Sequence, residues 1–190
     1  MKNGSKQLAI WTLLALGCAS SGVFGVVSLR AVGIAETGAR LQFRGTLDVV
    51  LKAERTTYRL GDRVQLEVLL VNTSDSEFYI DRRLEWGPVG PLSLSVTDGV
   101  TDEAVAPPVP YAHYLPRSAD SREDYLKLPP QHVYGQRREW TLRQLDITAV
   151  GTYRLRVAFS GPFGETFGLP VWRPEREAVY SNSVTIRVVE

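Results

Sequence analysis

The side chains that could bind a metal ion lie in one proline-rich stretch in the second half of the chain. His113 and His132 are the two histidines of the sequence, and Asp120, Glu123 and Asp124 lie between them. Two imidazoles and a carboxylate can bind zinc and other transition metals. Because this spacing matches no established metal motif, polar loop residues are the simpler interpretation. We expect no metal site and no bound cofactor.

Sequence motifs typical of enzymes are absent as well. The chain contains no Gly-x-Ser-x-Gly, no His-Glu-x-x-His, no Walker loop and no Gly-x-Gly-x-x-Gly. Cys18 is the single cysteine, and it lies in the N-terminal leader, so no cysteine nucleophile remains in the rest of the chain. We therefore expect no catalytic residues and a protein that is not an enzyme.

The overall charge excludes a further class of function. Lysine and arginine total 22 and aspartate and glutamate total 21, which gives a net charge of +1 over 190 residues. Nucleic-acid binding depends on a positive excess that this chain lacks. One cysteine also excludes an intramolecular disulfide, so the fold must be held by packing and hydrogen bonds.

The N-terminal leader has the pattern of an export signal. Lys2 and Lys6 form a short positive region, and Leu8 to Gly17 is apolar. The run Leu14-Ala15-Leu16-Gly17-Cys18 resembles a bacterial lipobox. In that family the cysteine thiol receives a diacylglycerol and becomes the mature N-terminus. The resemblance implies a signal peptide over residues 1–18, lipid attachment at Cys18 and a membrane-anchored protein.

Two other interpretations of the leader stay open. Residues 8–29 carry no charge and, as a helix, would span about 33 Å, enough for a transmembrane signal anchor. Cleavage near Ala19 or Ala35 would instead release a soluble protein. All three interpretations export the rest of the chain. We expect a location in the cell envelope, outside the cytoplasm, on the periplasmic side or at the cell surface.

Residues 46–190 are predicted to form one β-domain, after a linker over residues 19–45. Apolar and polar residues alternate over several short runs, which indicates strands with one buried face. The clearest runs begin at Leu47, Val64, Leu92, Tyr153 and Val184. No helical period extends over 11 or more residues after Gly45. This pattern predicts an all-β, antiparallel sandwich with Leu66, Val68, Leu94, Tyr153, Leu155, Val157 and Ile186 in its core.

The segment Ala149-Val150-Gly151-Thr152-Tyr153-Arg154-Leu155 resembles the start of strand F in immunoglobulin-like (Ig-like) domains. In that family a corner tyrosine binds nearby backbone and a cysteine follows two positions later. Here Tyr153 matches the tyrosine, and Leu155 takes the place of the cysteine. The resemblance implies an Ig-like sandwich of about seven to nine strands, behind a hydrophobic N-terminal helix.

Two further segments resemble bacterial extracytoplasmic Ig-like modules, including the group related to the BsuPI proteinase inhibitor. They are Tyr58 to Val68, followed by Asn72-Thr73-Ser74, and the closing Ser181-Asn182-Ser183-Val184-Thr185-Ile186. These motifs are structural, so they imply a fold and transfer no functional residue.

The most unusual stretch runs from Ala104 to Gln136, where six prolines alternate with tyrosines. Long loops of this kind often carry function, and tyrosine favours recognition. Tyr111, Tyr114 and Tyr125 are the candidate partner-binding residues. We expect a non-enzymatic, envelope-tethered module for protein binding or scaffolding. The alternatives are a BsuPI-like proteinase inhibitor and an accessory subunit of an envelope enzyme.

Overall fold

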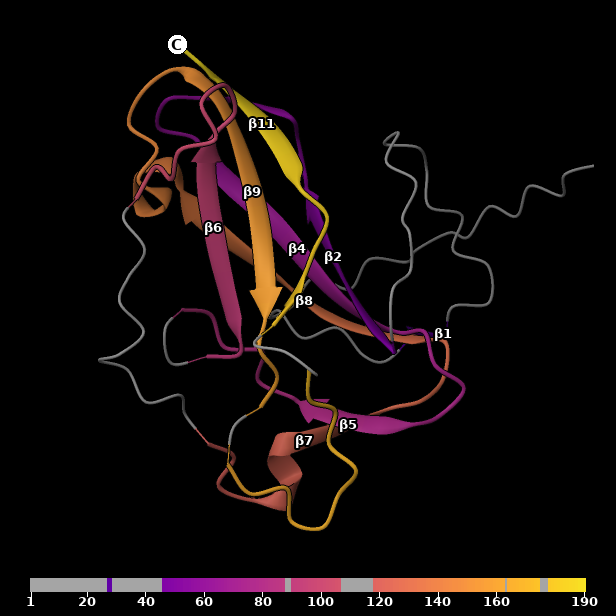
Figure 1. The fold of residues 1–190 in the computed structure, drawn as a ribbon. Coiled ribbons are helices and arrows are strands. Elements are labelled where there is room, and N and C mark those ends of the chain that lie inside the picture. The colour runs from indigo at the N-terminus through magenta and orange to yellow at the C-terminus, as the bar shows by residue number, and fades with distance from the viewer. Residues whose placement is uncertain (1–26, 29–45, 88–89, 107–117, 163, 175–177) are drawn as a thin grey trace, which may run out of the picture.

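The computed structural model describes residues 27–28, 46–87, 90–106, 118–162, 164–174 and 178–190. Within these ranges the chain forms eleven strands and two short 3-10 helices. Figure 1 labels all of the strands except β3 and β10. The number of strands exceeds the expected seven to nine because two strands have only two residues and two others form a separate small sheet. The expected all-β architecture is confirmed for the described residues. The predicted N-terminal helix lies outside them.

The first sheet has the strand order β1-β8-β4-β2. Its main strands are β2 (Leu47–Ala53), β4 (Arg63–Asn72) and β8 (His132–Thr141). β4 pairs antiparallel with both neighbours, with Leu51 opposite Val68 and Leu66 opposite Arg138. Alternate residues of β4, from Val64 to Leu70, are fully buried, which is the predicted period of two.

The second sheet has the order β10-β9-β11-β3, with β6 on the other side of β9. Its strands are β3 (Thr57–Arg59), β6 (Leu92–Asp98), β9 (Gly151–Phe159), β10 (Val179–Tyr180) and β11 (Val184–Val189). β9 pairs antiparallel with β6 and β11, whereas β3 pairs parallel with β11. Figure 1 shows β6, β9 and β11 lying over β4, β8 and β2, so the two sheets form a sandwich.

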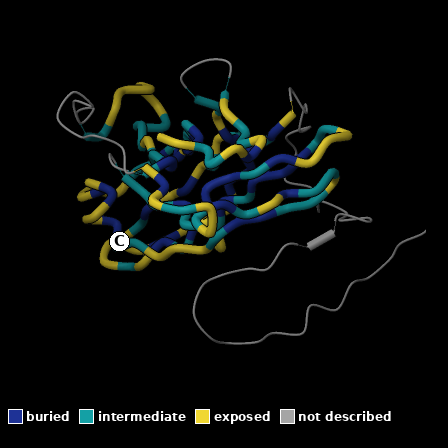
Figure 2. Tube along the Cα trace, turned by 90° about the horizontal axis from the view of Figure 1, so that it is seen from below, coloured by how far each residue is buried: buried dark blue, intermediate teal, exposed yellow. Residues whose placement is uncertain are grey.

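The core lies between these two sheets, where buried residues gather in Figure 2. Leu66 and Val68 from β4 and Leu155 and Val157 from β9 have no exposed surface and belong to one apolar cluster. Tyr153 and Ile186 are buried in it as well. Leu94 was expected in the core but is only half-buried, because it lies at an open side of the sandwich described below.

The Tyr153 side chain forms the expected corner. Its hydroxyl donates a hydrogen bond of 2.9 Å to the carbonyl oxygen of Ala149, four residues upstream. The 3-10 helix η3 (Leu142–Leu145) precedes this corner and leads from β8 into β9. With β2-β4-β8 in one sheet and β6-β9-β11 in the other, the strand order fits the A-B-E and C-F-G strands of an Ig-like module.

A third, two-stranded sheet was not expected from the sequence. It consists of β5 (Phe78–Asp81) and β7 (Tyr125–Leu128), with the 3-10 helix η2 (Arg122–Asp124) directly before β7. Figure 1 places it at the lower end of the sandwich. Its two strands come from the connections before and after β6, so these long connections are partly ordered by pairing with each other.

One side of the sandwich is closed by the Asn182 side chain. Asn182 lies in the short break between β10 and β11, and its amide binds the backbone of Leu51 on β2. The Leu51 N–H donates to Asn182 Oδ1 at 2.9 Å, and Asn182 Nδ2 donates to the Leu51 carbonyl at 3.0 Å. This amide therefore joins the edge of the first sheet to the second.

Strand β1 (Val27–Ser28) pairs antiparallel with β8 at Val133 and His132. It lies inside the segment predicted as a linker, and also inside the alternative signal anchor over residues 8–29. Cys18 lies outside the described residues. The described part of the chain contains no helix long and apolar enough to cross a bilayer.

Changing Tyr153 to Phe removes the corner hydrogen bond and leaves the ring in the core. We expect a loss of about 1 kcal/mol in the free energy of unfolding, the usual net value of one hydrogen bond. Urea unfolding of the purified protein measures it. Tyr180→Phe is the control, because Tyr180 is exposed, and it should change stability little. Equal effects of both variants would contradict a structural role for the corner.

Candidate functional site

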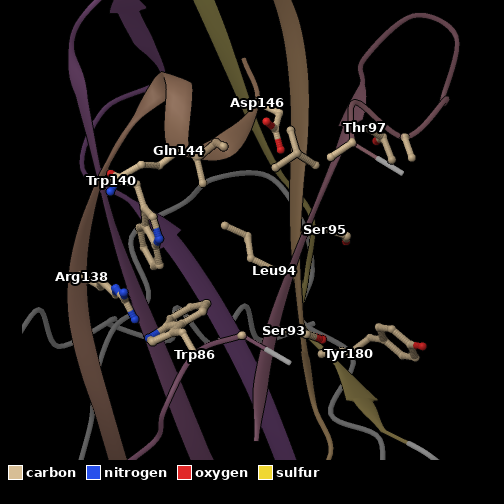
Figure 3. Close-up of a pocket in the computed structure, with 16 residues that line it drawn as sticks. Trp86, Ser93, Leu94, Ser95, Thr97, Arg138, Trp140, Gln144, Asp146 and Tyr180 are labelled. Atoms are coloured by element: carbon tan, nitrogen blue, oxygen red, sulfur yellow. The ribbon is translucent and has the colours of Figure 1, made fainter. Parts of the chain in front are cut away.

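The sandwich is open on the side where the edges of β6 and β8 face each other. We call this opening the open flank and define it by Trp86, Leu94, Val96, Arg138 and Trp140. A cavity of about 590 Å³ lies here, lined by these residues and by Leu145. Figure 3 shows Leu94 extending from β6 toward the two tryptophans, with Arg138 beside them.

The alternation of β8 explains why a charged residue lines this cavity. Tyr134, Gln136, Arg138 and Trp140 are spaced by two, so they share the inner face of the strand. Tyr134 is buried and Gln136 is half-buried, whereas Arg138 is exposed. The inner face of β8 is therefore covered at Tyr134 and uncovered at Arg138. Arg138 and Trp140, near the end of the strand, form one wall of the open flank.

The segment after β5 places Trp86 in the cavity. The Tyr134 hydroxyl donates to the carbonyl of Arg82 at 2.6 Å, and Gln136 Nε2 donates to the carbonyl of Leu84. Leu84 has a φ of 46°, a left-handed conformation that costs a non-glycine residue about 1–3 kcal/mol. Its side chain is fully buried in the core, which holds this turn in place.

The aromatic rings and the guanidinium group of the open flank contact one another. The rings of Trp86 and Trp140 meet edge to face, with 4.8 Å between centroids and 81° between planes. The Arg138 guanidinium lies over the Trp140 ring, 5.2 Å from its centroid. The indole Nε1–H of Trp86 is buried and has no hydrogen-bond acceptor among the described residues. This end of the cavity can thus receive an apolar group and an anion together.

Gln144 and Asp146 line the other end of the cavity, next to η3. Asp146 ends the 3-10 helix in a left-handed conformation with a φ of 57°. Both side chains are exposed. The cavity at the open flank therefore has a cationic end at Arg138 and an anionic end at Asp146.

The predicted partner-binding tyrosines are not brought together in the described residues. Tyr111 and Tyr114 lie outside them. Tyr125 is 4% exposed and packs with Ala119 and Leu169, and its ring meets Phe167 at 6.4 Å. Its hydroxyl donates to the carbonyl of Glu165 at 2.8 Å, and burial raises the pKa of this hydroxyl. In this arrangement Tyr125 belongs to a small second core beneath the β5–β7 sheet.

Two of the residues considered for a metal site, His132 and Asp124, contact backbone groups instead. His113 lies outside the described residues, and His132 Nδ1 is 2.8 Å from the carbonyl oxygen of Pro130. Asp124 Oδ2 accepts hydrogen bonds from the backbone N–H groups of Asp120 and Ser121. Within the described ranges, no three His, Cys, Asp or Glu side chains gather as a metal site.

Trp86, Arg138 and Trp140 were not identified from the sequence. Arg138 follows Arg137 in the sequence, and such a basic pair is typical of a solvated strand face. The two tryptophans are 54 positions apart. A usable signal was present in β8. Every second residue of β8 lies on the same face. On the inner face the buried Tyr134 is followed by two polar residues, Gln136 and Arg138, and then by Trp140.

No protein-family model and no curated protein sequence matches the chain. Among solved structures, the chain is similar to Spo0M, a sporulation control protein from Bacillus subtilis, with 11% identity and a TM-score of 0.42. That match covers 77% of this chain and 51% of Spo0M, so the chain spans about half of that protein.

It is also similar to the CARDB domain of the PF1109 protein from Pyrococcus furiosus, with 13% identity and a TM-score of 0.36, over 75% of this chain and 87% of that one. A β-glucosidase from Erythrobacter marinus matches with 16% identity and a TM-score of 0.39, over 75% of this chain and 15% of that enzyme. These similarities identify no family, and the fold assignment depends on the strand pairing described above.

Replacing Tyr125 with Ala should lower the free energy of unfolding by about 3 kcal/mol, as expected when a buried aromatic side chain is removed. Thermal or urea unfolding measures the change. Tyr180→Ala is the matched control, because Tyr180 is 55% exposed. A loss below about 0.5 kcal/mol, which is typical of surface substitutions, would show that Tyr125 is not packed as described.

Proposed function

We propose that the chain is a non-enzymatic, Ig-like module of the cell envelope that binds a protein partner through the open flank. The observation that carries this proposal is the cluster of the half-buried Trp86 and Trp140 with the exposed Arg138, set where the core is left uncovered. Tryptophan and arginine are the residues that most often dominate the energy of protein interfaces. Two tryptophans could serve only to stabilise the core. The exposed guanidinium of Arg138 over the Trp140 ring adds hydrogen-bond donors that point in fixed directions and can contact a partner.

The inhibitor alternative depends on a rigid loop in the proline-rich stretch. Residues 107–117 of that stretch lie outside the described residues, and the proposal is therefore built on the open flank, whose geometry the structure describes. An accessory role for an envelope enzyme is compatible with the same surface, because it too requires binding to a protein. The proposed function is therefore partner binding.

We also propose that a lipid on Cys18 tethers the module to a membrane. The lipobox-like run ending at Cys18 supports this proposal. Strand β1 argues against a membrane-spanning helix over the whole of residues 8–29, because Val27–Ser28 pair with β8. Two or three acyl chains give stable anchoring, whereas a single chain gives marginal binding.

The binding proposal is tested by site-specific photo-crosslinking in cells that express the full chain. A photoreactive amino acid at Gln144, on the rim of the cavity, should give a defined crosslinked product. The same amino acid at Lys52, an exposed position on β2, should not. Arg138→Glu should abolish the product at Gln144, whereas Arg137→Glu should preserve it, because the side chains of adjacent strand residues point to opposite faces.

Equal crosslinking from Gln144 and Lys52 would contradict a specific binding surface. Loss of the product in both charge variants would show a general effect of net charge instead of a contact with Arg138. The melting temperature of each variant is measured alongside, because Arg137→Glu also replaces the ion pair with Glu67 by two facing carboxylates, and loss of binding must be separated from loss of folding.

The tether is tested with Cys18→Ala, radiolabelled palmitate and membrane fractionation. The wild-type chain should incorporate label and sediment with membranes. The variant should take no label and remain unprocessed. Membrane association without label in both proteins would favour the signal anchor, and a soluble, unlabelled wild-type protein would favour release by cleavage.

A further inference from the structure

In the middle of β6, on the edge that faces away from β9, some backbone N–H and C=O groups have no hydrogen-bond partner among the described residues. Leu92 turns its backbone away from β9, since its N–H donates to the carbonyl of Glu85 at 3.1 Å and its carbonyl accepts from the N–H of Gly87 at 2.8 Å. Antiparallel strands alternate in this respect. Leu94 and Val96 therefore also direct their N–H and C=O groups away from β9, toward the open flank.

The far end of the same edge is covered by the turn that follows β6. The N–H of Val105 donates to the carbonyl of Val96 at 3.0 Å, and the N–H of Asp98 donates to the carbonyl of Glu103 at 2.8 Å. Between the two covered ends, the N–H and C=O of Leu94 and the N–H of Val96 have no backbone partner among the described residues. We call these three groups the β6 window.

The β6 window has the hydrogen-bonding pattern of one step in an antiparallel ladder. A residue of an added strand opposite Leu94 would exchange both of its backbone hydrogen bonds with Leu94. Its side chain would lie on the same face as that of Leu94, which points into the cavity. At about 3.3 Å per residue, the stretch from Leu92 to Val96 is roughly 13 Å long, which suits a short extended peptide.

The charges of the open flank select the chemistry of that peptide. Arg138 forms no ion pair or hydrogen bond among the described residues. Its guanidinium makes a cation–π contact with the Trp140 ring. Asp146 lies at the opposite end of the cavity and disfavours an anion there. A carboxylate near Arg138 could accept two parallel hydrogen bonds from the guanidinium, as in a bidentate ion pair.

We infer that the partner contributes an extended peptide segment that adds to the β6 window and turns an acidic side chain toward Arg138. This inference rests on the proposed function and names its ligand class. Main-chain hydrogen bonds supply part of the affinity in strand addition, and side chains facing the receptor supply specificity. The tryptophans and Leu94 would receive apolar residues on either side of the acidic one.

The probe is the acetylated and amidated peptide Thr-Val-Thr-Asp-Thr-Val-Thr, in which valine and aspartate share one face. Binding to the full chain is followed by tryptophan fluorescence and by hydrogen exchange at the Leu94 amide. We expect saturable binding and at least tenfold slower exchange at Leu94. The same peptide with a central lysine, or N-methylated at its second, fourth and sixth residues, should bind at least tenfold more weakly.

Two pairs of variants locate the contacts in the chain. Arg138→Glu should reverse the preference from the aspartate peptide to the lysine peptide, and Arg137→Glu should not. Leu94→Pro removes the outward N–H without touching the ladder to β9, and an edge strand tolerates such a proline. It should weaken binding at least tenfold more than Leu94→Ala, which removes the side chain only.

The outcomes separate the inference from the proposed function. Equal binding of the N-methylated peptide would overturn strand addition and leave a surface that recognises side chains. Absence of binding by every peptide would also overturn the inference. Crosslinking at Gln144 decides independently whether the open flank binds a protein at all. If Leu94→Pro unfolds the chain, the N-methylated peptide still tests the window.

Discussion

The burial of two facing aliphatic surfaces is the interaction on which this structure depends. Cys18 is the single cysteine, so no disulfide joins the sheets. Leu66 and Val68 on β4 and Leu155 and Val157 on β9 supply the contact instead. A slip of either strand by one residue would turn these side chains to solvent, so the hydrophobic pattern also fixes the strand register. The Tyr153 corner then fixes the start of β9, and the Asn182 amide joins β2 to the second sheet.

The same dependence on burial explains where the molecule is open. Along β8 the inner face changes from Tyr134, which is buried, to Arg138, which is exposed. An unpaired guanidinium is too costly to bury in a core, so the sheets cannot close over it. Leu94, on the opposing edge, is half-exposed as a result. The open flank is thus a property of residue types on two strands, and both proposals made for this protein use that property.

The sequence predicted the parts of the fold that follow from local alternation. The β4 and β9 cores and the Tyr153 corner could be identified because each depends on residues a few positions apart. The β5–β7 sheet could not, because 43 residues separate the end of β5 at Asp81 from the start of β7 at Tyr125. Trp86 and Trp140 meet for reasons of tertiary packing that no local pattern contains. Tyr125 illustrates the converse problem, because a tyrosine in a proline-rich stretch looks the same in sequence whether it is exposed or covers a second core.

The Asn182 amide has a consequence for self-association. It occupies both outward backbone groups of Leu51, in the middle of the strand that ends the first sheet. Edge strands with exposed backbone groups are the usual starting point for fibres, and open-ended growth requires every molecule to offer a donor edge and an acceptor edge. Here a side chain already fills the places that a neighbouring copy would need at Leu51. If a partner strand adds to β6 as proposed, β2 would not offer a free edge at Leu51 for a further addition, so such binding would stay separate from polymerisation.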